Sequence, residues 1–412
     1  MAARGPHFAL RFVDGRALLV ARDLPLAGVV VEELILDVPS VRFPMDVSGG
    51  ADRFQHRRLS LRKLLLDADA DALRGLLQTA LPGIRSVQIL DGHVDVEAQA
   101  GSVGETLFLR AAVVPAPPAS VDLVVTRVLA VGGGSLQPLR ELARVLEKLG
   151  AQETGLGPLV VRIPVVKWVA RELLVGGGWK IPDVSQVRDL DVRVVPEGIH
   201  LDASAESVSR SVLPRPVQER LARVMAASLS LSGWNTLPSV RGLLDRADHQ
   251  PLALALLVPL ASLELAEDET EAALQAALQR APQDLDLLAA RARLSPSDGG
   301  RWAALARAAE EAGERSLVHA AALTWAALAS ADADVTTALQ MAARARPESP
   351  HVALSLALLH ARSARWVDAL RYARDALERD LPPDDEKLAA RCLGRARMHT
   401  GDLVGARPRQ RA

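Results

Sequence analysis

The chain has a single cysteine, Cys392, among its 412 residues. One cysteine can form no intrachain disulfide and cannot supply the cysteine cluster of a structural zinc site. Its alanine-rich, helix-forming neighbours predict a small buried apolar side chain rather than a reactive thiol. The sequence therefore excludes disulfide-stapled scaffolds and cysteine-rich zinc proteins.

An excess of charge of one sign is lacking as well. The 49 Lys and Arg residues nearly balance the 50 Asp and Glu residues, so the formal net charge is −1. A near-neutral chain creates no overall electric field that would attract nucleic acid or an anionic membrane. We therefore expect no nucleic-acid partner.

Long hydrophobic runs are missing too. A membrane-spanning helix needs about 20 consecutive apolar residues, and the longest candidate, Pro251–Leu265, is shorter and is better interpreted as a buried helix. The amino-terminal residues lack the apolar core of a secretion signal. These absences predict a cytoplasmic protein without a transmembrane segment, either free or bound at the periphery of a membrane.

The sequence lacks the common motifs of catalysis, metal binding and nucleotide binding. It has no GxSxG and no HExxH pattern, and the run Gly132–Gly134 is not followed by the Gly-Lys-Ser/Thr of a phosphate-binding loop. Asp67, Asp69 and Asp71 lack the downstream glutamate of a calcium loop and are better explained as caps of a helix. We expect no enzyme activity, no cofactor and no metal.

Composition divides the chain into two halves. Residues 1–207 are rich in Val, Ile and Leu in alternating patterns, whereas alanine and leucine at helical spacing dominate the second half. At 412 residues the chain is long enough for two to four domains. We predict an α+β domain over 1–207, connecting helices over 208–264 and an all-α region of helical repeats over 265–412.

The stretch Leu59–Gly101 organises the first half. It begins with a predicted strand that has leucines on one face, and the alternation of these leucines shifts once within the strand. A helix follows, and then a hairpin with its turn at Asp91-Gly92. A second hairpin with a glycine turn is predicted over Gln186–Ala205. The strand leucines are Leu59, Leu61, Leu64 and Leu66, and the helix leucines are Leu73, Leu76, Leu77 and Leu81.

Further elements are predicted on both sides of this stretch. Strands are expected at His7–Phe12 and Ala17–Ala21, joined by a turn at Asp14-Gly15, and at Val29–Val38, Thr106–Val114, Val121–Val131 and Pro158–Pro164. Helices are expected at Leu136–Leu149, Val165–Leu174, Pro216–Ser228, Leu237–Arg246 and Pro251–Leu265. The pattern predicts a curled antiparallel sheet packed on helices.

The order of these elements resembles the LmeA-type phospholipid-binding domain, a family related in shape to tubular lipid-binding (TULIP) domains. The resemblance extends over about Leu24 to Ala205. It implies a long curled sheet that wraps on helices around an apolar groove for a phospholipid or another apolar ligand. The residues that carry it are Leu64–Gly101, Val121–Gly132, Ile181-Pro182 and Gly198-Ile199-His200-Leu201.

The sequence leaves open whether this interior is hollow or filled. Alternating Val and Leu residues packed over a helix give an apolar interior. If some of the inward-facing side chains are small, this interior keeps a space large enough for a ligand. The alternative is a solid structural core. If the groove is open, its expected lining is Leu64, Leu66, Leu73, Leu76, Leu77, Val87 and Ile89.

The densest basic cluster of the sequence comprises Arg57, Arg58, Arg62 and Lys63. On a strand, several of these charges would share one exposed face and would be available to lipid phosphates. The alternative is a solvated strand edge that its charges protect from pairing with another chain.

Small residues recur at helical spacing in the second half. Ala277 precedes Pro282 by five residues, and Ala342 precedes Pro347 by the same interval. These positions resemble tetratricopeptide repeats, whose helix pairs recur every 34 residues or so and need small residues where the helices touch. About four repeats are expected over 265–412, with the last one incomplete. The expected packing positions are Ala342, Ala369, Ala376 and Gly394.

These observations together predict a non-enzymatic binding protein. Its α+β domain would hold a phospholipid or another apolar ligand, and its repeats would recruit a protein partner. The alternative is a pure scaffold, in which the first domain is a solid module and only the repeats bind a partner.

Overall fold

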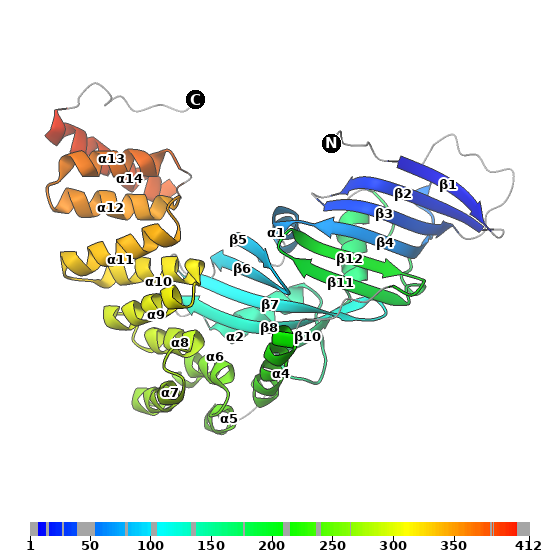
Figure 1. Ribbon diagram of the computed structural model, residues 1–412, viewed down its shortest axis with the longest axis horizontal. Coiled ribbons are helices and arrows are strands. Elements are labelled where there is room, and N and C mark those ends of the chain that lie inside the picture. Colours follow the sequence, from blue (N-terminus) through cyan, green and yellow to red (C-terminus); the bar gives the residue numbers. More distant parts are fainter. Residues whose placement is uncertain are drawn as a thin grey trace. The chain divides into compact units, whose positions relative to one another are not determined.

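A computed structural model gives the fold of the chain (Figure 1). The turn predicted at Asp14-Gly15 and most of the Gly132–Gly134 loop lie outside the residues that the structure describes. The described residues are 7–13, 16–26, 29–38, 54–78, 81–99, 105–132, 137–175, 178–208, 215–235, 240–263, 265–379, 381 and 383–401.

The chain divides into two compact units at Arg280. The first unit contains all the strands together with several helices, and the second is made of helices alone. This arrangement confirms the predicted fold class, α+β followed by an all-α region. The repeats are predicted to begin at residue 265, and the division between the two units falls one helix later.

Sheet A has six antiparallel strands in the order β1-β2-β3-β4-β12-β11. The chain forms the first four strands in succession, continues into a second sheet, and returns with the predicted β11–β12 hairpin, in which β12 pairs with β4. The strands are β1 (His7–Val13), β2 (Arg16–Leu26), β3 (Val29–Val38), β4 (Ser60–Ala68), β11 (Asp189–Val195) and β12 (Gly198–Ser204).

Two β-bulges explain the slip in the alternation of β3 and β4. Relative to its partner, β4 carries the extra residue Arg62, and β3 carries the extra residue Glu32. An extra residue resets which side chains point to each face of the sheet. The predicted leucines therefore stay buried on both sides of the slip: Leu59, Leu61, Leu64 and Leu66 are each at most 4% exposed.

Sheet B also has six strands, in the order β5-β6-β7-β8-β10-β9. The predicted hairpin at Asp91-Gly92 is confirmed, because Leu90 pairs with His93 and Gly92 has the positive φ, 76°, that such a turn requires. The strands are β5 (Ile84–Leu90), β6 (His93–Gln99), β7 (Thr106–Ala116), β8 (Ser120–Val131), β9 (Gln152–Glu153) and β10 (Val160–Ile163).

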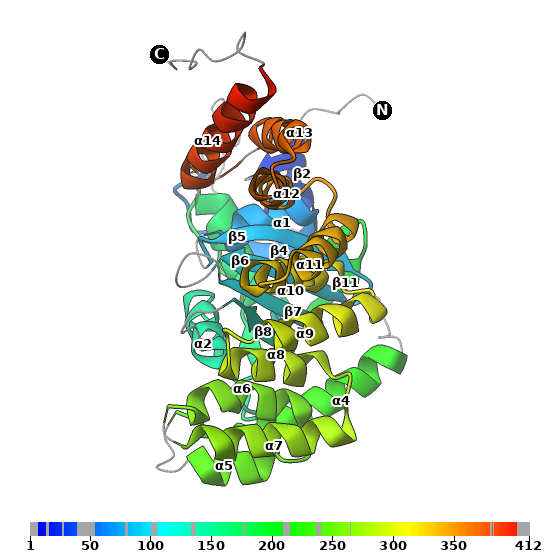
Figure 2. The same cartoon turned by 90° about the vertical axis from the view of Figure 1, so that its left-hand side faces the viewer.

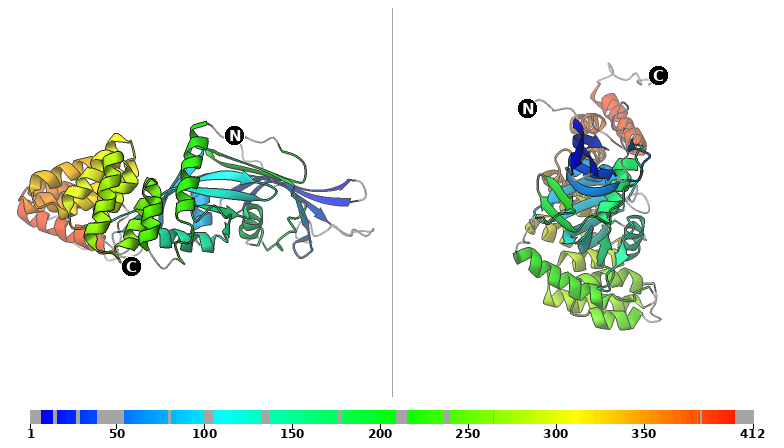
Figure 3. Two further views of the ribbon diagram at one scale, coloured as in Figure 1. Left: turned by 90° about the horizontal axis from the view of Figure 1, so that it is seen from below. Right: turned by 90° about the vertical axis from the view of Figure 1, so that its right-hand side faces the viewer.

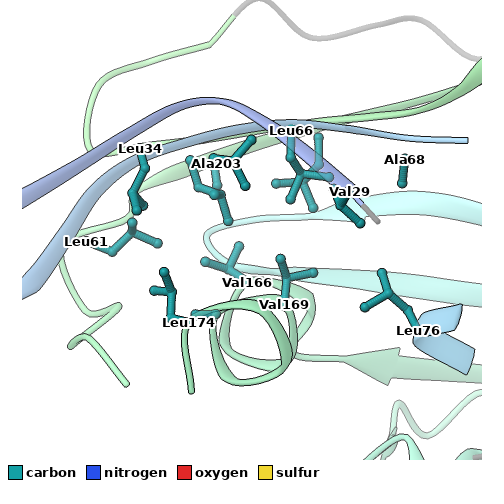
Figure 4. Close-up of a cluster of buried hydrophobic side chains, with 14 of the residues drawn as sticks. Val29, Leu34, Leu61, Leu66, Ala68, Leu76, Val166, Val169, Leu174 and Ala203 are labelled. Atoms are coloured by element: carbon teal, nitrogen blue, oxygen red, sulfur yellow. The ribbon is translucent and has the colours of Figure 1, made fainter. Parts of the chain in front are cut away.

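Helices cover the inner faces of the two sheets. In Figure 4, Val166 and Val169 of α3 and Leu174 of the following π-helical turn point toward Leu61 and Leu66 of β4. The helices α1 and α2 lie against sheet B. The helical elements of this unit are α1 (Ala70–Leu77), α2 (Pro138–Lys148), α3 (Val165–Ala170), η2 (Arg171–Val175), α4 (Arg215–Ser230), α5 (Val240–Ala247), α6 (Pro251–Ala261) and α7 (Glu267–Arg280).

The second unit is a succession of antiparallel helix pairs (Figure 2). The first helices of successive pairs begin at Leu285, Arg315, Pro350 and Pro383, which is close to the roughly 34-residue period of tetratricopeptide repeats. The helices are α8 (Leu285–Leu294), α9 (Gly299–Glu311), α10 (Arg315–Leu328), α11 (Asp332–Ala345), α12 (Pro350–Arg362), α13 (Trp366–Leu377) and α14 (Pro383–Thr400).

An arginine that follows the second helix of a pair ties that pair together. Arg346, after α11, donates to the Ser316 hydroxyl at the start of α10 over 2.7 Å. Arg379, after α13, donates to the carbonyl of Pro347 just before α12 over 2.9 Å. A comparable contact thus recurs about one period later, although one arginine binds a hydroxyl and the other a backbone carbonyl.

No helix in the described part of the chain is long and apolar enough to cross a membrane. The most apolar helix, α6, is almost wholly buried inside the first unit, as the sequence predicts for this segment.

Candidate functional site

An apolar groove lies between the inner face of sheet B and the helices α1 and α2. Its volume is about 140 Å³. Strands β6, β7 and β8 form its floor, and the start of β12 contributes one side chain. The apolar groove is lined by Leu73, Leu77, Leu81, Val94, Val96, Leu109, Ala111, Val113, Leu123, Val125, Leu142, Val145, Leu146, Leu149 and Ile199.

The groove is open to solvent, because several of its inward-facing side chains are only half-buried. Leu109, Ala111 and Val113 of β7 and Leu123 of β8 belong to this group. In a filled core these alternate positions would be fully buried. Ala111 is the one lining residue smaller than valine.

The helix α1 takes part in two apolar layers at once. Its first turn is capped by Asp69, whose carboxylate accepts the Ala72 N–H over 2.8 Å, and this confirms the capping role predicted for that residue. Leu73 and Leu77, one turn apart, line the groove. Leu76 is buried and points toward the α3 side of the unit in Figure 4.

The helix α2 provides the opposite wall through an amphipathic pattern. Leu142, Val145, Leu146 and Leu149 face the groove, whereas Arg144 and its charged neighbours are exposed. A helix with this pattern buries one stripe and leaves the other in water. Pro138 begins the helix, a position where the missing N–H costs nothing.

The interior of sheet A is closed by comparison. A void among Leu34, Leu61, Leu64, Val169 and neighbouring side chains measures about 10 Å³. A cavity needs roughly 10–15 Å³ to hold even one water molecule. This void therefore has no room for a ligand.

The structure brings some of the predicted lining residues to the groove and places the others in the packed core. Leu73 and Leu77 line the groove. Val87 and Ile89 of β5 lie on the same face of sheet B, since they pair with Val96 and Val94, but they are buried one strand further out. The remaining three, Leu64, Leu66 and Leu76, belong to the core shared with sheet A and α3.

Most of the groove comes from segments that the sequence analysis did not connect with a site. The alternation in β7 and β8 and the helical spacing in α2 were visible. The contact between these strands and α2 could not be predicted, because no local sequence pattern shows which helix covers which strands.

The predicted basic cluster is split in the structure. Arg57 and Arg58 are exposed, and the Arg57 guanidinium lies 5.7 Å from the centre of the Phe54 ring. Lys63 instead forms an ion pair of 2.8 Å with Glu33, which also binds Arg22. The hydrogen bond between Lys63 and Glu33 raises the pKa of the lysine and lowers the pKa of the glutamate.

This pairing leaves Arg57 and Arg58 as the exposed part of the cluster, together with the half-buried bulge residue Arg62. Contact of these side chains with lipid phosphates stays a prediction.

Three titratable side chains meet on the outer face of sheet A. His200 of β12 is hydrogen-bonded to Asp67 of β4, and a side-chain hydrogen bond between Asp67 and the bulge residue Glu32 raises the pKa of Glu32. His200 directly follows Ile199, which lines the groove, and α1 begins three residues after Asp67. The cluster therefore holds together the two strand ends beside the groove.

In the second unit, three of the predicted packing positions are fully buried: Ala342, Ala369 and Ala376 are all 0% exposed. The fourth, Gly394 of α14, is exposed, and a Cβ atom added there would meet none of the described atoms within 4 Å. Cys392 is buried against Ala357 and Ala373, as predicted, and burial raises the pKa of its thiol.

The described residues offer little for metal-based chemistry. Among them, no group of three or more His, Cys, Asp and Glu side chains is arranged to hold a metal ion. Two histidines of the second unit are used in ring packing: His360 stacks on Tyr372 at 5.4 Å, and His399 stacks on Trp366 at 3.9 Å.

No protein-family model matches the chain, and no curated protein matches it either.

Proposed function

We propose that the first unit binds one alkyl chain of a lipid, or another apolar molecule of that width, in the apolar groove. The observation that carries the proposal is a groove lined only by apolar side chains, several of them half-exposed to solvent. Exposing such a surface is unfavourable by roughly 25 cal/mol per Å², so an apolar ligand that covers it is stabilised. No catalytic step is part of this proposal.

The volume of the groove limits what enters. A dry apolar cavity of about 150 Å³ accepts a molecule of benzene's size, whereas pockets for drug-sized ligands measure about 300–1,000 Å³. The groove, at about 140 Å³, matches a segment of one chain. A two-chain phospholipid would place one chain segment inside and keep its headgroup outside.

The second part of the proposal is that the helix pairs bind a protein partner, in the manner of tetratricopeptide repeats. Large apolar side chains are exposed on the last described helices, with Val367 of α13 at 74% and Met398 of α14 at 68%. Side chains this exposed are available for contact with a partner. The proposed setting is the cytoplasm, at the periphery of a membrane.

The competing function is a scaffold whose first unit is a solid module. The closed interior of sheet A fits that alternative, but the half-exposed lining of the groove favours a ligand. Native mass spectrometry of the full chain, purified without detergent, distinguishes the two. We expect a bound mass that extraction identifies as a lipid or a fatty acid. An apo mass in every preparation, with no gain in fluorescence of an added apolar dye, would contradict lipid binding.

A further inference from the structure

Two segments of the first unit that are far apart in the sequence lie side by side just before β4. The Lys180 N–H donates to the Gln55 carbonyl over 2.9 Å, and the Asp183 N–H donates to the Leu59 carbonyl over 2.8 Å. Backbone hydrogen bonds therefore hold the two segments together as one strip. The described residues of this strip are 54–59, 174–175 and 178–183.

The inner side of the strip is packed. Phe54 and Leu174 are at most 4% exposed, and the half-buried Trp179 packs against the same core. Figure 4 shows Leu174 pointing toward sheet A, and in Figure 3 the blue-green helix α3, which leads into the strip, lies along one side of the sheets. The exposed side chains of the strip therefore face away from sheet A.

Positive charge is concentrated on this exposed side. Arg57, Arg58 and Lys180 are exposed. Lys167 and Arg171, which are exposed residues of α3 and of the turn after it, extend the same basic region. Because the formal net charge of the whole chain is −1, any attraction for an anionic surface comes from this local concentration of charge.

Two large aliphatic side chains lie on the same strip as these cations. Val175 is 48% and Ile181 is 44% exposed, although their neighbours in the chain, Leu174 and Pro182, are buried. Aliphatic side chains gain free energy by leaving water. Trp179, between them in the sequence, is half-buried, and tryptophan is enriched where a membrane meets water.

We propose that this basic–apolar surface, formed by Arg57, Arg58, Val175, Lys180 and Ile181, binds an anionic lipid bilayer. The three cations bind lipid phosphates at the level of the headgroups, and the two aliphatic side chains enter the boundary between headgroups and acyl chains. The inference rests on the peripheral membrane setting proposed above and does not depend on the groove under sheet B.

The mixture of charge and apolar side chains favours a bilayer over an acidic protein as the occupant. A bilayer offers phosphates with acyl chains directly beneath them, so cations and aliphatic side chains are stabilised by the same contact. An acidic protein would pair with the cations and give Val175 and Ile181 no comparable gain. The only carboxylate among the described residues of the strip, Asp183, lies at its end and accepts hydrogen bonds from the N–H and hydroxyl of Ser185.

The first test removes the charges from the full chain, with Arg57→Gln, Arg58→Gln and Lys180→Gln combined. Each basic side chain near an anionic surface strengthens binding about fivefold. Flotation with vesicles of phosphatidylcholine and phosphatidylserine should therefore show an affinity on the order of 100-fold weaker for this variant. The matched control, which should bind like the wild type, replaces three exposed arginines of the second unit by glutamine: Arg362, Arg365 and Arg391.

The second test removes the aliphatic side chains. Val175→Ser with Ile181→Ser should weaken binding to the same vesicles on the order of tenfold, because less apolar surface leaves water on binding. The matched control is Leu229→Ser with Leu263→Ser, two side chains of the first unit that are 49% and 64% exposed, and it should bind like the wild type. Circular dichroism should be unchanged in all variants, since the replaced side chains are exposed.

Three results would overturn the proposal in different ways. A wild type that does not bind these vesicles would contradict both the surface and the peripheral setting, whereas fatty-acid binding tests the groove separately. Full vesicle binding by the charge variant would contradict the surface alone. If the charge variant loses binding but Val175→Ser with Ile181→Ser binds as tightly as its control, the contact is made through charge alone, and an acidic protein replaces the bilayer as the occupant.

Discussion

Sheet A and sheet B are built alike, yet one covers a solid core and the other a groove. Both have six strands with apolar side chains on their inner faces. Under sheet A, α3 and the turn after it leave a void of only about 10 Å³. Under sheet B, α1 and α2 leave about 140 Å³.

The difference lies in the covering helices and in one small residue. Under sheet A, a helix with the buried residues Val166, Val169 and Ala170 lies directly beneath large strand residues and fills the space. Under sheet B, two helices form opposite walls, and Ala111 is short where a larger side chain would fill the centre. The same alternating pattern thus gives a packed core or an open groove, depending on what covers it.

The largest contrast is expected when a leucine is truncated in each interior. Leu61→Ala removes a fully buried side chain under sheet A and should lower the free energy of unfolding by about 2–5 kcal/mol. Leu77→Ala removes a half-buried side chain from the groove and should cost only about 1 kcal/mol. Urea unfolding followed by circular dichroism measures both. Equal losses would show that the groove is packed as tightly as the core.

Enlarging a small residue reverses the test. Ala203→Leu overfills the interior of sheet A, where Ala203 is 0% exposed, and should cost about 1–3 kcal/mol. Ala111→Leu points into the groove and should leave the free energy of unfolding within about 0.5 kcal/mol of the wild type, because the space is already there. A large loss for Ala111→Leu would mean that sheet B, too, is closed.

A similar contrast between closed and open positions is predicted in the second unit. Ala369→Leu or Ala376→Leu should overpack the contact between helices, because both alanines are 0% exposed, and should lower stability by about 1–3 kcal/mol. Gly394→Ala should instead raise helix stability by about 0.5–1 kcal/mol, since the position is open among the described atoms. Thermal unfolding measures each change. A loss for Gly394→Ala would indicate that another helix packs on that glycine, as the repeat resemblance implies.

The smallest contrast is between two neighbouring glutamates on sheet A. The pKa of Glu32 is raised by its hydrogen bond with Asp67, with Asp23 and His200 as further charged neighbours, so its stabilising contribution is lost as pH rises from about 4.3 through the raised value. The pKa of Glu33 is lowered by Lys63 and Arg22, so its contribution is present above that pH and lost on acidification.

Glu32→Gln should therefore raise stability near pH 7, and Glu33→Gln should lower it. Because Glu32 is exposed and the Arg22 and Lys63 partners of Glu33 reach solvent, we expect changes of less than about 0.5 kcal/mol after screening. Chemical unfolding at pH 4 and pH 7 measures the difference, and the same sign for both variants would contradict the assigned partners.

Local elements of the fold could be predicted from the sequence. The slip between Leu61 and Leu64 predicted an irregularity that is the bulge at Arg62. The Asp91-Gly92 turn and the Asp69 cap were predicted because each depends on neighbouring residues alone.

The candidate site could be predicted only in part. Leu73 and Leu77 were predicted as lining, but Leu109, Leu123 and Leu142 were not, because their meeting depends on contacts between distant segments. The pairing of Lys63 with Glu33 was missed for the same reason, since it depends on the register of β3 against β4.

The central claim, that the groove under sheet B takes an apolar chain, is tested most directly by titrating the full chain with a fluorescent fatty acid. Ala111→Phe places a phenyl ring in the groove, and Val114→Phe places the same ring on the opposite face of β7. The account predicts saturable binding by the wild type and by Val114→Phe, and at least a tenfold weaker affinity for Ala111→Phe, about 1.4 kcal/mol. Equal affinity of all three proteins, or no saturable binding by the wild type, would contradict it.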